Sequence, residues 1–231
     1  MTRHIELEWP DQTPFRDRGG ASIRLLVISD ALEPSLMDLR NRQVLAPIDL
    51  IVGCGDLDCE DLSFIADGFD APLVYVCGNH DSPERWAACK DFCPEPLQSA
   101  AVRHLAGLAV AGLTWPGTRG KRATRSELAA WSQAVRLAMR RLGKSEPLIV
   151  VSHVPPLGAG DISDGNYHRG FRGYRWLMER LAPPLWLHGH TPLAATGDWR
   201  IQVGRTTLVN ATGAIMIELL PPKPKATKAG A

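Results

Sequence analysis

Short apolar runs recur along the chain, and each of them ends on a polar residue. The runs cover residues 23–29, 50–53, 73–77, 148–152 and 185–187. They are rich in β-branched side chains, which is typical of strands that are buried on both faces of a sheet. In α/β sheets ligands bind outside the carboxyl ends of the strands, so we expect the polar residues that follow these five runs to converge on one place.

Helical spacing of apolar positions appears in three of the intervening segments. Residues 35–46 predict a helix with Ser35 as its N-cap, and residues 83–92 predict a second one with a proline in the first turn. The clearest helix is predicted over residues 126–142, where an apolar stripe faces a row of arginines. That stripe consists of Leu128, Trp131, Val135, Leu137, Ala138 and Leu142.

Further strands are predicted over residues 102–114 and, with short alternating patterns, after residue 199. The later ones cover 200–203, 207–211 and 214–219, which indicates antiparallel pairing and a mixed sheet in an α/β fold. We expect residues 1–22 to form an irregular lead-in, residues 23–220 to form one domain, and residues 221–231 to be a disordered basic tail. A chain of 231 residues with 45% hydrophobic residues can bury a single sizeable core.

The net charge of +1 gives no support to a nucleic-acid partner. No apolar run approaches the roughly 18 residues that cross a bilayer, and the first residues lack the layout of a signal peptide, so we expect a cytoplasmic protein without a membrane partner. The five cysteines lack paired C-x-x-C spacing, so we expect them to be small buried residues in a reducing compartment.

The polar residues at the ends of the runs have a characteristic order. They are Ser29-Asp30, Gly55-Asp56, Gly78-Asn79-His80-Asp81, Ser152-His153 and Gly189-His190. This order resembles the calcineurin-like metallophosphoesterase family, and the similarity spans about residues 23–215. The resemblance implies a four-layer α/β/β/α sandwich of two mixed sheets flanked by helices, with one or two divalent transition metal ions.

The resemblance also implies a role for each residue of these motifs. One metal would be held by Asp56, Asn79, His153 and His190, with Asp56 bridging to a second metal that Asp30 also binds. Carboxylate, amide and imidazole ligands favour Mn, Fe, Zn or Co, which would lower the pKa of a bridging water and so supply hydroxide. His80 would then stabilise or protonate the leaving oxygen, and Asp81 would orient its ring.

The chain departs from the family pattern at two positions. Leu32 and Pro192 stand where the family usually has histidine, and neither side chain offers a lone pair to a metal. The first metal site is therefore water-rich, weakly occupied, filled from elsewhere or absent. Glu33, Asp58 and His188 are nearby in sequence as weak substitute ligands.

Each of these residues also has a structural interpretation. Asp30 after a strand is commonly a turn or helix cap, and Glu33 follows it as in a capping box. His153 and His190 taken singly resemble satisfied core histidines. The polar segment 161–175 carries His168, Arg169 and Arg172, which are candidate substrate-binding residues or simply the solvated entry to a helix.

Two functions of different classes remain open from the sequence, and between them lies a slower one-metal enzyme in which only the site of Asp56, Asn79, His153 and His190 is filled. The first is a metal-dependent phosphoesterase that hydrolyses a small phosphomonoester or phosphodiester, which fits the complete set of residues for one metal together with His80. The alternative is a catalytically degenerate scaffold or binding module of the same fold, which the missing histidines favour.

Overall fold

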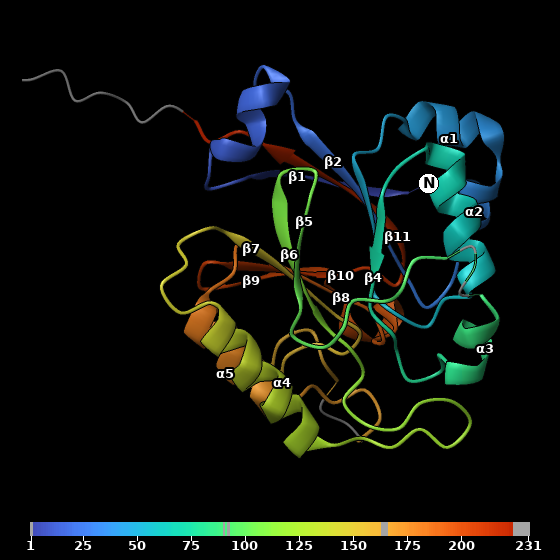
Figure 1. The fold of residues 1–231 in the computed structure, drawn as a ribbon, viewed down its shortest axis with the longest axis vertical. Helices are drawn as coiled ribbons and strands as arrows, with labels where there is room; N and C mark the ends of the chain where they lie inside the picture. Colours follow the sequence, from blue (N-terminus) through green and yellow to red (C-terminus); the bar gives the residue numbers. More distant parts are fainter. Residues whose placement is uncertain (1, 90, 92, 163–165, 224–231) are drawn as a thin grey trace, which may run out of the picture.

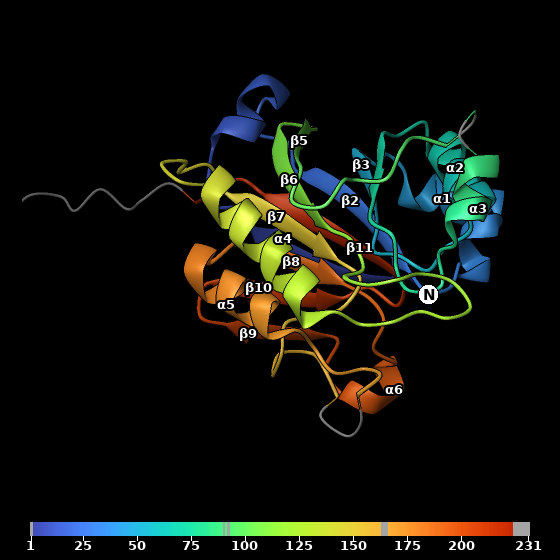
Figure 2. The same cartoon turned by 60° about the horizontal axis from the view of Figure 1, so that its bottom comes forward.

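Two mixed β-sheets face each other and helices cover their outer faces, in a computed structural model that describes residues 2–89, 91, 93–162 and 166–223 (Figure 1). Helices α1, α2 and α3 lie together on one side of the molecule, and α4 and α5 lie on the other (Figure 2). The four-layer α/β/β/α architecture is therefore confirmed.

The first sheet contains five strands in the order β1-β11-β2-β3-β4. Strand β11 is antiparallel to β2 and parallel to β1, while β2, β3 and β4 are parallel. The strands are β1 (Arg3–Glu8), β2 (Ile23–Ser29), β3 (Leu50–Gly53), β4 (Leu73–Tyr75) and β11 (Gly213–Leu220). The helices over this sheet are α1 (Leu39–Leu45), α2 (Cys59–Phe69) and α3 (Pro83–Ala88).

The second sheet contains six strands in the order β5-β6-β7-β8-β10-β9, with β6, β7, β8 and β10 parallel. The strands are β5 (Val102–Leu105), β6 (Leu108–Leu113), β7 (Leu148–Ser152), β8 (Leu185–His188), β9 (Arg200–Val203) and β10 (Thr206–Asn210). Its helices are α4 (Glu127–Arg140) and α5 (Arg172–Leu181). The short elements are η1 (Thr13–Arg18), η2 (Pro34–Met37) and α6 (Leu193–Thr196).

Strand β2 shows why the predicted runs are continuously apolar. Leu25 and Val27 belong to the core between the two sheets, whereas Leu26 and Ile28 belong to the core beneath the helices. Both faces are therefore dry, and burying each such side chain contributes roughly 1.5–3 kcal/mol. Three of the predicted runs coincide with β2, β3 and β7 residue for residue.

Part of the predicted irregular lead-in is a strand. Residues 3–8 pair with β11 along their whole length and form the edge of the first sheet, with Ile5 buried and Glu6 exposed. The alternation of apolar and polar residues there is short and consists of only two aliphatic side chains, Ile5 and Leu7. The prolines and glycines that follow are the stronger signal in the sequence, and they indicate irregular structure. From residue 224 onward the predicted tail lies outside the described residues.

All three predicted helices differ in extent from the observed ones. Helix α3 ends at Ala88 rather than at residue 92, and residues 90 and 92 lie outside the described part of the chain. The segment 35–46 begins with the turn η2, and Asp38 rather than Ser35 caps α1, so Leu39 and Val44 are exposed. Helix α4 does begin after Ser126, whose hydroxyl accepts a hydrogen bond from the Ala129 amide.

The predicted apolar stripe of α4 is wrong in part. The helix buries Ala130, Gln133, Ala134 and Leu137, whereas Leu128 is 82% exposed. The close approach of α4 to α5 favours alanines, since the backbone at Gly173 of α5 lies so near Ala130 and Trp131 that a Cβ there would overlap them.

The prediction that all five cysteines are simple buried thiols is also wrong. Cys59 at the start of α2 and Cys89 after α3 form a disulfide, with their Cα atoms 6.2 Å apart. Cys54, Cys77 and Cys93 are free and buried, as expected. The expected compartment stays a prediction. Within the described residues, no helix is long and apolar enough to span a bilayer.

Candidate metal centre

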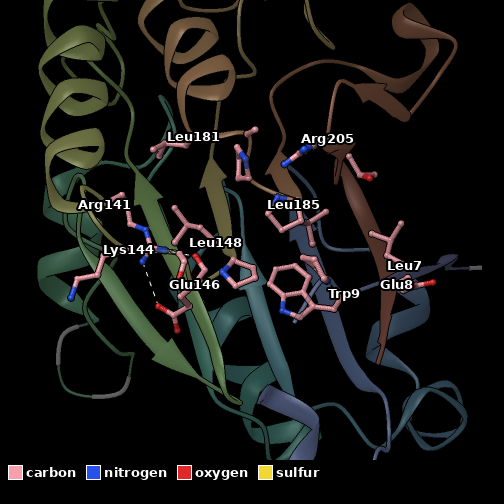
Figure 3. Close-up of a pocket in the computed structure, with 17 residues that line it drawn as sticks. Leu7, Glu8, Trp9, Arg141, Lys144, Glu146, Leu148, Leu181, Leu185 and Arg205 are labelled. Atoms are coloured by element: carbon pink, nitrogen blue, oxygen red, sulfur yellow. Dashed lines mark hydrogen bonds and ion pairs between the residues drawn. The ribbon is translucent and has the colours of Figure 1, made fainter. Parts of the chain in front are cut away.

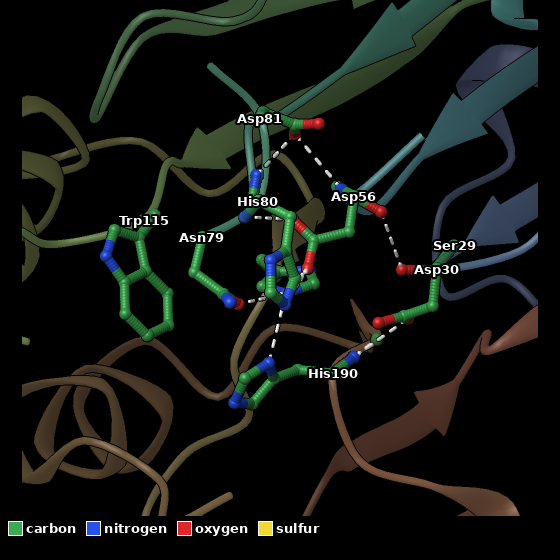
Figure 4. Close-up of polar contacts among 12 residues, drawn as sticks. Ser29, Asp30, Asp56, Asn79, His80, Asp81, Trp115 and His190 are labelled. Carbon is green, nitrogen blue, oxygen red and sulfur yellow. Dashed lines mark hydrogen bonds and ion pairs between the residues drawn. The ribbon is translucent and has the colours of Figure 1, made fainter. Parts of the chain in front are cut away.

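The ends of five strands from both sheets converge, as the sequence predicts. Asp30 follows β2, Asp56 follows β3 and Asn79 follows β4, all in the first sheet. His153 and His190 follow β7 and β8 of the second sheet, and their side chains meet those of the first (Figure 4). The group therefore spans the seam between the two sheets.

Tight turns bring these side chains together. The backbone of Asp30, Asp56 and His190 is left-handed, with φ of 63°, 56° and 66°, a conformation that side-chain-bearing residues rarely adopt and that concentrates at functional sites. Two glycines allow the closest contacts. A Cβ at Gly78 would overlap the carboxylate of Asp56, and one at Gly189 would overlap that of Asp30.

His153 Nε2 lies at the middle of the cluster. It is 3.1 Å from Asp56 Oδ2, 3.0 Å from Asn79 Oδ1 and 3.1 Å from His190 Nδ1. Two nitrogen or oxygen atoms that each lie about 2.1 Å from one ion are roughly 3.0–3.4 Å apart in octahedral or tetrahedral coordination. The observed separations therefore fit ligands arranged around one common ion.

The outer contacts of the cluster fix which atoms carry lone pairs. His153 Nδ1 donates to the Cys54 carbonyl oxygen at 2.9 Å, and His190 Nε2 donates to that of Tyr167 at 2.8 Å. When both rings are neutral, the remaining ring nitrogens are acceptors, and His153 Nε2 then faces the oxygens of Asp56 and Asn79 and the Nδ1 of His190. In that state the four acceptors have no donor among them, so either a proton on His153 Nε2 or a divalent cation would be needed to relieve their repulsion.

The electrostatics of the cluster also favour a cation. Burial opposes a charge on His153, but the hydrogen bond and negative charge of Asp56 prevail and raise the pKa of His153 to about 9. The pKa of Asp56 is lowered against the effect of its own burial, because His153 bonds and attracts its carboxylate. Burial and the charge of His153 lower the pKa of His190 to about 3, so the His190 ring is neutral.

Asp30 contacts the cluster through the backbone of His190. Its Oδ2 accepts hydrogen bonds from the backbone amide of His190 at 2.9 Å and from Thr212 Oγ1 at 3.2 Å. Among the described residues of this site, three offer acid or imidazole ligand atoms that all lie within 4.8 Å of one another: Asp56, His153 and His190. Asp30 thus braces the turn that carries His190.

Leu32 and Pro192 are not part of the cluster. Leu32 packs against the outer core beneath the helices, and Pro192 is an exposed residue that caps α6. Glu33, proposed as a substitute, instead accepts from Ser35 Oγ at 3.1 Å and from the Ala214 amide at 3.3 Å.

The two other substitutes lie elsewhere as well. His188 is fully buried under Gly160, and burial lowers its pKa to about 4. Asp58 precedes α2 as its N-cap residue. Neither belongs to the group formed by Asp56, His153 and His190.

His80 projects over the cluster toward solvent. Its side chain is 67% exposed and its Nε2 lies 4.0 Å from Asp56 Oδ2, while its backbone amide donates to Asp56 Oδ1 at 2.7 Å. Asp81 is placed differently from the expectation that it orients this ring. Its Oδ2 accepts from the backbone amides of Asp56 at 3.0 Å and Gly78 at 2.6 Å, so it ties two turns together.

The structure brings one of the three candidate substrate-binding residues against the cluster. The His168 ring lies 5.2 Å from that of His190, measured between centroids, and burial lowers its pKa. Arg169 and Arg172 are exposed, and Arg172 is the first residue of α5.

Two further residues contact this region and were not singled out by the sequence. Tyr167 hydrogen-bonds Asn79, His80 and His190, and Arg125 holds the backbone of the segment that carries Tyr167. A tyrosine in a polar, glycine-rich loop was the available signal.

Trp115 forms the buried wall behind the cluster, with its ring 5.7 Å from that of His190.

A separate pocket lies at the other end of the second sheet (Figure 3). It has a volume of about 590 Å³ and lies at the beginnings of β7 and β8, where Leu148 and Leu185 line it. Its charged residues include Arg141 and Glu146, which pair at 3.4 Å. None of Asp56, His153 and His190 lines this pocket.

Comparisons with known proteins agree with the fold and the motifs. The model of the calcineurin-like phosphoesterase family matches residues 23–194. The protein TT1561 of Thermus thermophilus is similar in structure, with a TM-score of 0.58 and 18% identity over 83% of this chain and 90% of that one.

Two other solved structures share the fold. A putative 5′-nucleotidase from Staphylococcus aureus has a TM-score of 0.53 and 11% identity over 91% of this chain and 56% of its own. A dimetal phosphatase from Danio rerio has a TM-score of 0.50 and 12% identity over 84% and 88%. No curated protein sequence matches this chain.

Proposed function

Because the chain belongs to the calcineurin-like phosphoesterase family, we propose that it is a metal-dependent phosphoesterase acting on a small phosphomonoester or phosphodiester. One observation carries the proposal. Four acceptor atoms from Asp56, Asn79, His153 and His190 face one another at the strand ends, with the second nitrogen of each ring bonded to a backbone carbonyl.

The same four residues would hold a divalent ion such as Mn, Fe, Zn or Co. Their oxygen and nitrogen donors suit these metals better than a thiolate-seeking one. When bound, the ion supplies Lewis-acid activation of a phosphoryl oxygen and of the attacking water.

We infer that the centre holds one ion rather than two. Leu32 and Pro192 offer no ligand atoms, and Oδ2 of Asp30 already accepts two hydrogen bonds that brace the His190 turn. A second ion would have only the carboxylates of Asp30 and Asp56 and water. A single ion neutralises less charge in the transition state, so turnover would be slow relative to a dinuclear centre.

His80 is the proposed general acid. Its exposed ring faces the side of the cluster that is open to solvent, where an ester can approach. As the oxygen of water bonds to phosphorus and the bond to the leaving group breaks, the imidazole would give its proton to the leaving oxygen. The proton that the attacking water loses would pass to solvent, from which the imidazole is protonated again. Asp81 contributes by holding the turns of Asp56 and Gly78 in place.

The segment that carries His168 also carries the other two candidate substrate-binding groups. His168, Arg169 and Arg172 come from the segment that overlies His190, and the two guanidinium groups are exposed. Arginine suits a phosphate ester because its planar fork donates two hydrogen bonds at once. We propose that these residues bind the part of the ester that stays outside the cluster.

The alternative proposal is a scaffold or binding module that retains the fold. It is motivated by Leu32 and Pro192, which remove two histidines of the family pattern. Such a module has no need of a ring placed like that of His80, so the retained His80 favours the enzyme.

The test is hydrolysis of p-nitrophenyl phosphate and bis-p-nitrophenyl phosphate by metal-stripped protein that is resupplied with Mn, Zn, Fe or Co. Activity should return with metal and should be lost in Asp56→Asn and His80→Ala, provided that circular dichroism shows both variants folded. Wild-type protein that stays inert with every metal and both esters would favour the scaffold.

A further inference from the structure

The Tyr167 hydroxyl bridges two residues of the Gly78-Asn79-His80-Asp81 motif. It accepts a hydrogen bond from Asn79 Nδ2 at 3.1 Å and lies 2.9 Å from His80 Nε2. Tyr167 itself is 52% exposed, so its ring reaches the cluster from the solvent side. A phenol hydroxyl has one donor and two acceptor positions, which is enough to bond both neighbours at once.

The bond to Asn79 has a consequence for the cluster. An asparagine amide presents either its oxygen or its nitrogen to a neighbour, and only the oxygen can bind a cation. Because Nδ2 of Asn79 donates to Tyr167, Oδ1 is turned inward to within 3.0 Å of His153 Nε2. The Tyr167 hydroxyl thus selects the orientation of the amide that suits a metal.

The bond to His80 restrains an otherwise free ring. The side chain of His80 is mostly exposed, and its nearest charged neighbour, Asp56, is 4.0 Å away. A hydrogen bond of 2.9 Å to Tyr167 keeps Nε2 over the cluster. An unrestrained imidazole would share its time among several rotamers and would be aligned with a leaving oxygen less often.

Arg125 holds the segment that carries Tyr167. Its Nη1 donates to the Tyr167 carbonyl at 2.6 Å, and its Nη2 donates to the carbonyl of Arg169. The guanidinium also lies over the Phe171 ring at 4.5 Å. Since Arg125 directly precedes Ser126, the cap of α4, the segment is anchored to a rigid helix.

We propose that Tyr167 is a positioning residue of the reaction centre, which orients the Asn79 amide and the His80 ring through one hydroxyl and is itself held by Arg125. This inference rests on the proposed phosphoesterase function. It adds a residue that reaches the centre from a segment outside the family's strand-end motifs and acts through its neighbours without touching the metal or the reacting atoms.

The first arm of the test needs no activity. Long-range ¹H–¹⁵N NMR spectra of the metal-free protein report the ring nitrogens of His80 and the side-chain amide of Asn79. Both sets of resonances should shift in Tyr167→Phe and stay unchanged in Asn166→Ala, a control in the same exposed segment that keeps the hydroxyl. The remote His104 ring serves as an internal reference.

The second arm separates positioning from binding. Tyr167→Phe should weaken Zn binding in calorimetry by about tenfold, the usual effect of losing a residue that orients a ligand. It should also lower kcat by about tenfold with KM changed less than twofold. The loss should be larger for phenyl phosphate than for p-nitrophenyl phosphate, because the poorer leaving group depends more on a well-placed proton donor. Arg125→Lys should show a smaller loss of the same kind.

The outcomes are distinct. If the Asn79 and His80 resonances of Tyr167→Phe match those of the wild type, the positioning role is overturned whatever the activity. If they shift but an active enzyme keeps its kcat for both esters, the role is likewise overturned. A wild type that hydrolyses no ester contradicts the proposed function, and the NMR arm then decides the role of Tyr167 by itself.

Discussion

His153 Nε2 and His190 Nδ1 lie 3.1 Å apart, and each ring donates the proton of its other nitrogen to a backbone carbonyl. With both rings neutral, two lone pairs would therefore point at each other in a buried place. A proton on His153 relieves this repulsion in the free protein, and a metal ion would relieve it more completely because Asp56 and Asn79 also contribute acceptors. The predictions about the centre follow from this arrangement.

Replacing His80 by alanine should remove turnover and leave the metal in place. The ring lies beside the four acceptors without belonging to them, and a positioned proton donor contributes about 10²–10⁴-fold to a rate. We expect kcat to fall by about that factor while metal content stays at the wild-type level. His104→Ala, which removes an exposed histidine near Glu146, is the matched control. Retained turnover in His80→Ala would exclude the proposed acid.

Metal binding should release a proton, and its affinity should rise with pH. With a pKa of about 9, His153 is protonated in the free protein at pH 7, and the ion must displace that proton. We expect release of about one proton per ion at pH 7, with affinity rising about tenfold per pH unit until pH 9. Calorimetry in two buffers of different ionisation enthalpy measures this release. A value near zero at pH 7 would show that His153 is already neutral.

The stability of the metal-free protein should fall between pH 6.5 and pH 9. The pKa of His153 is raised on folding, so its contribution is complete below pH 6.5 and is lost as the pH passes about 9. The loss is at most about 3 kcal/mol. His188 and His190 have lowered pKa values and therefore act below pH 6.5, outside this window. Thermal melts should show the fall in wild type and a smaller one in Asp56→Asn, which removes the strongest of the interactions that raise the pKa.

Two leucines of α4 should respond very differently to truncation. Leu137 is fully buried beneath the second sheet's helices, so Leu137→Ala should cost about 2–5 kcal/mol of unfolding free energy. Leu128 is largely exposed on the same helix, so Leu128→Ala should change it by less than about 0.5 kcal/mol. Urea denaturation of both variants measures the difference. Equal effects would mean that the helix presents its other face to the core.

The sequence predicted the central strands and their convergence for a definite physical reason. Strands such as β2 and β7 are buried on both faces, so their continuously apolar composition alone identifies them as strands. The polar residue after each strand shows where the edge of the sheet lies. Helices and strands with one solvent-exposed face were predicted less well. Strand β1 is held by pairing with β11, and α4 buries two alanines, Gln133 and Leu137 while Leu128 is exposed.

The missed residues depend on contacts between distant parts of the chain. Tyr167 lies 87 positions from His80, and the path of the segment between them is set by tertiary packing. The hold of Arg125 on that segment is likewise a contact between a side chain and two carbonyls, which have no signature in sequence. Asp81 was correctly placed at the turn, but its partners are backbone amides rather than the neighbouring ring.

The most direct test of a one-ion centre is the number of metal ions bound per chain. Equilibrium dialysis of purified protein against Zn or Mn, followed by elemental mass spectrometry, should find one ion in wild type. Asp56→Asn and His190→Ala should retain little of it, whereas Asp30→Asn, which alters a bracing contact, should keep most. Two ions in wild type would contradict the single-ion centre, and none at millimolar metal would contradict the metal centre altogether.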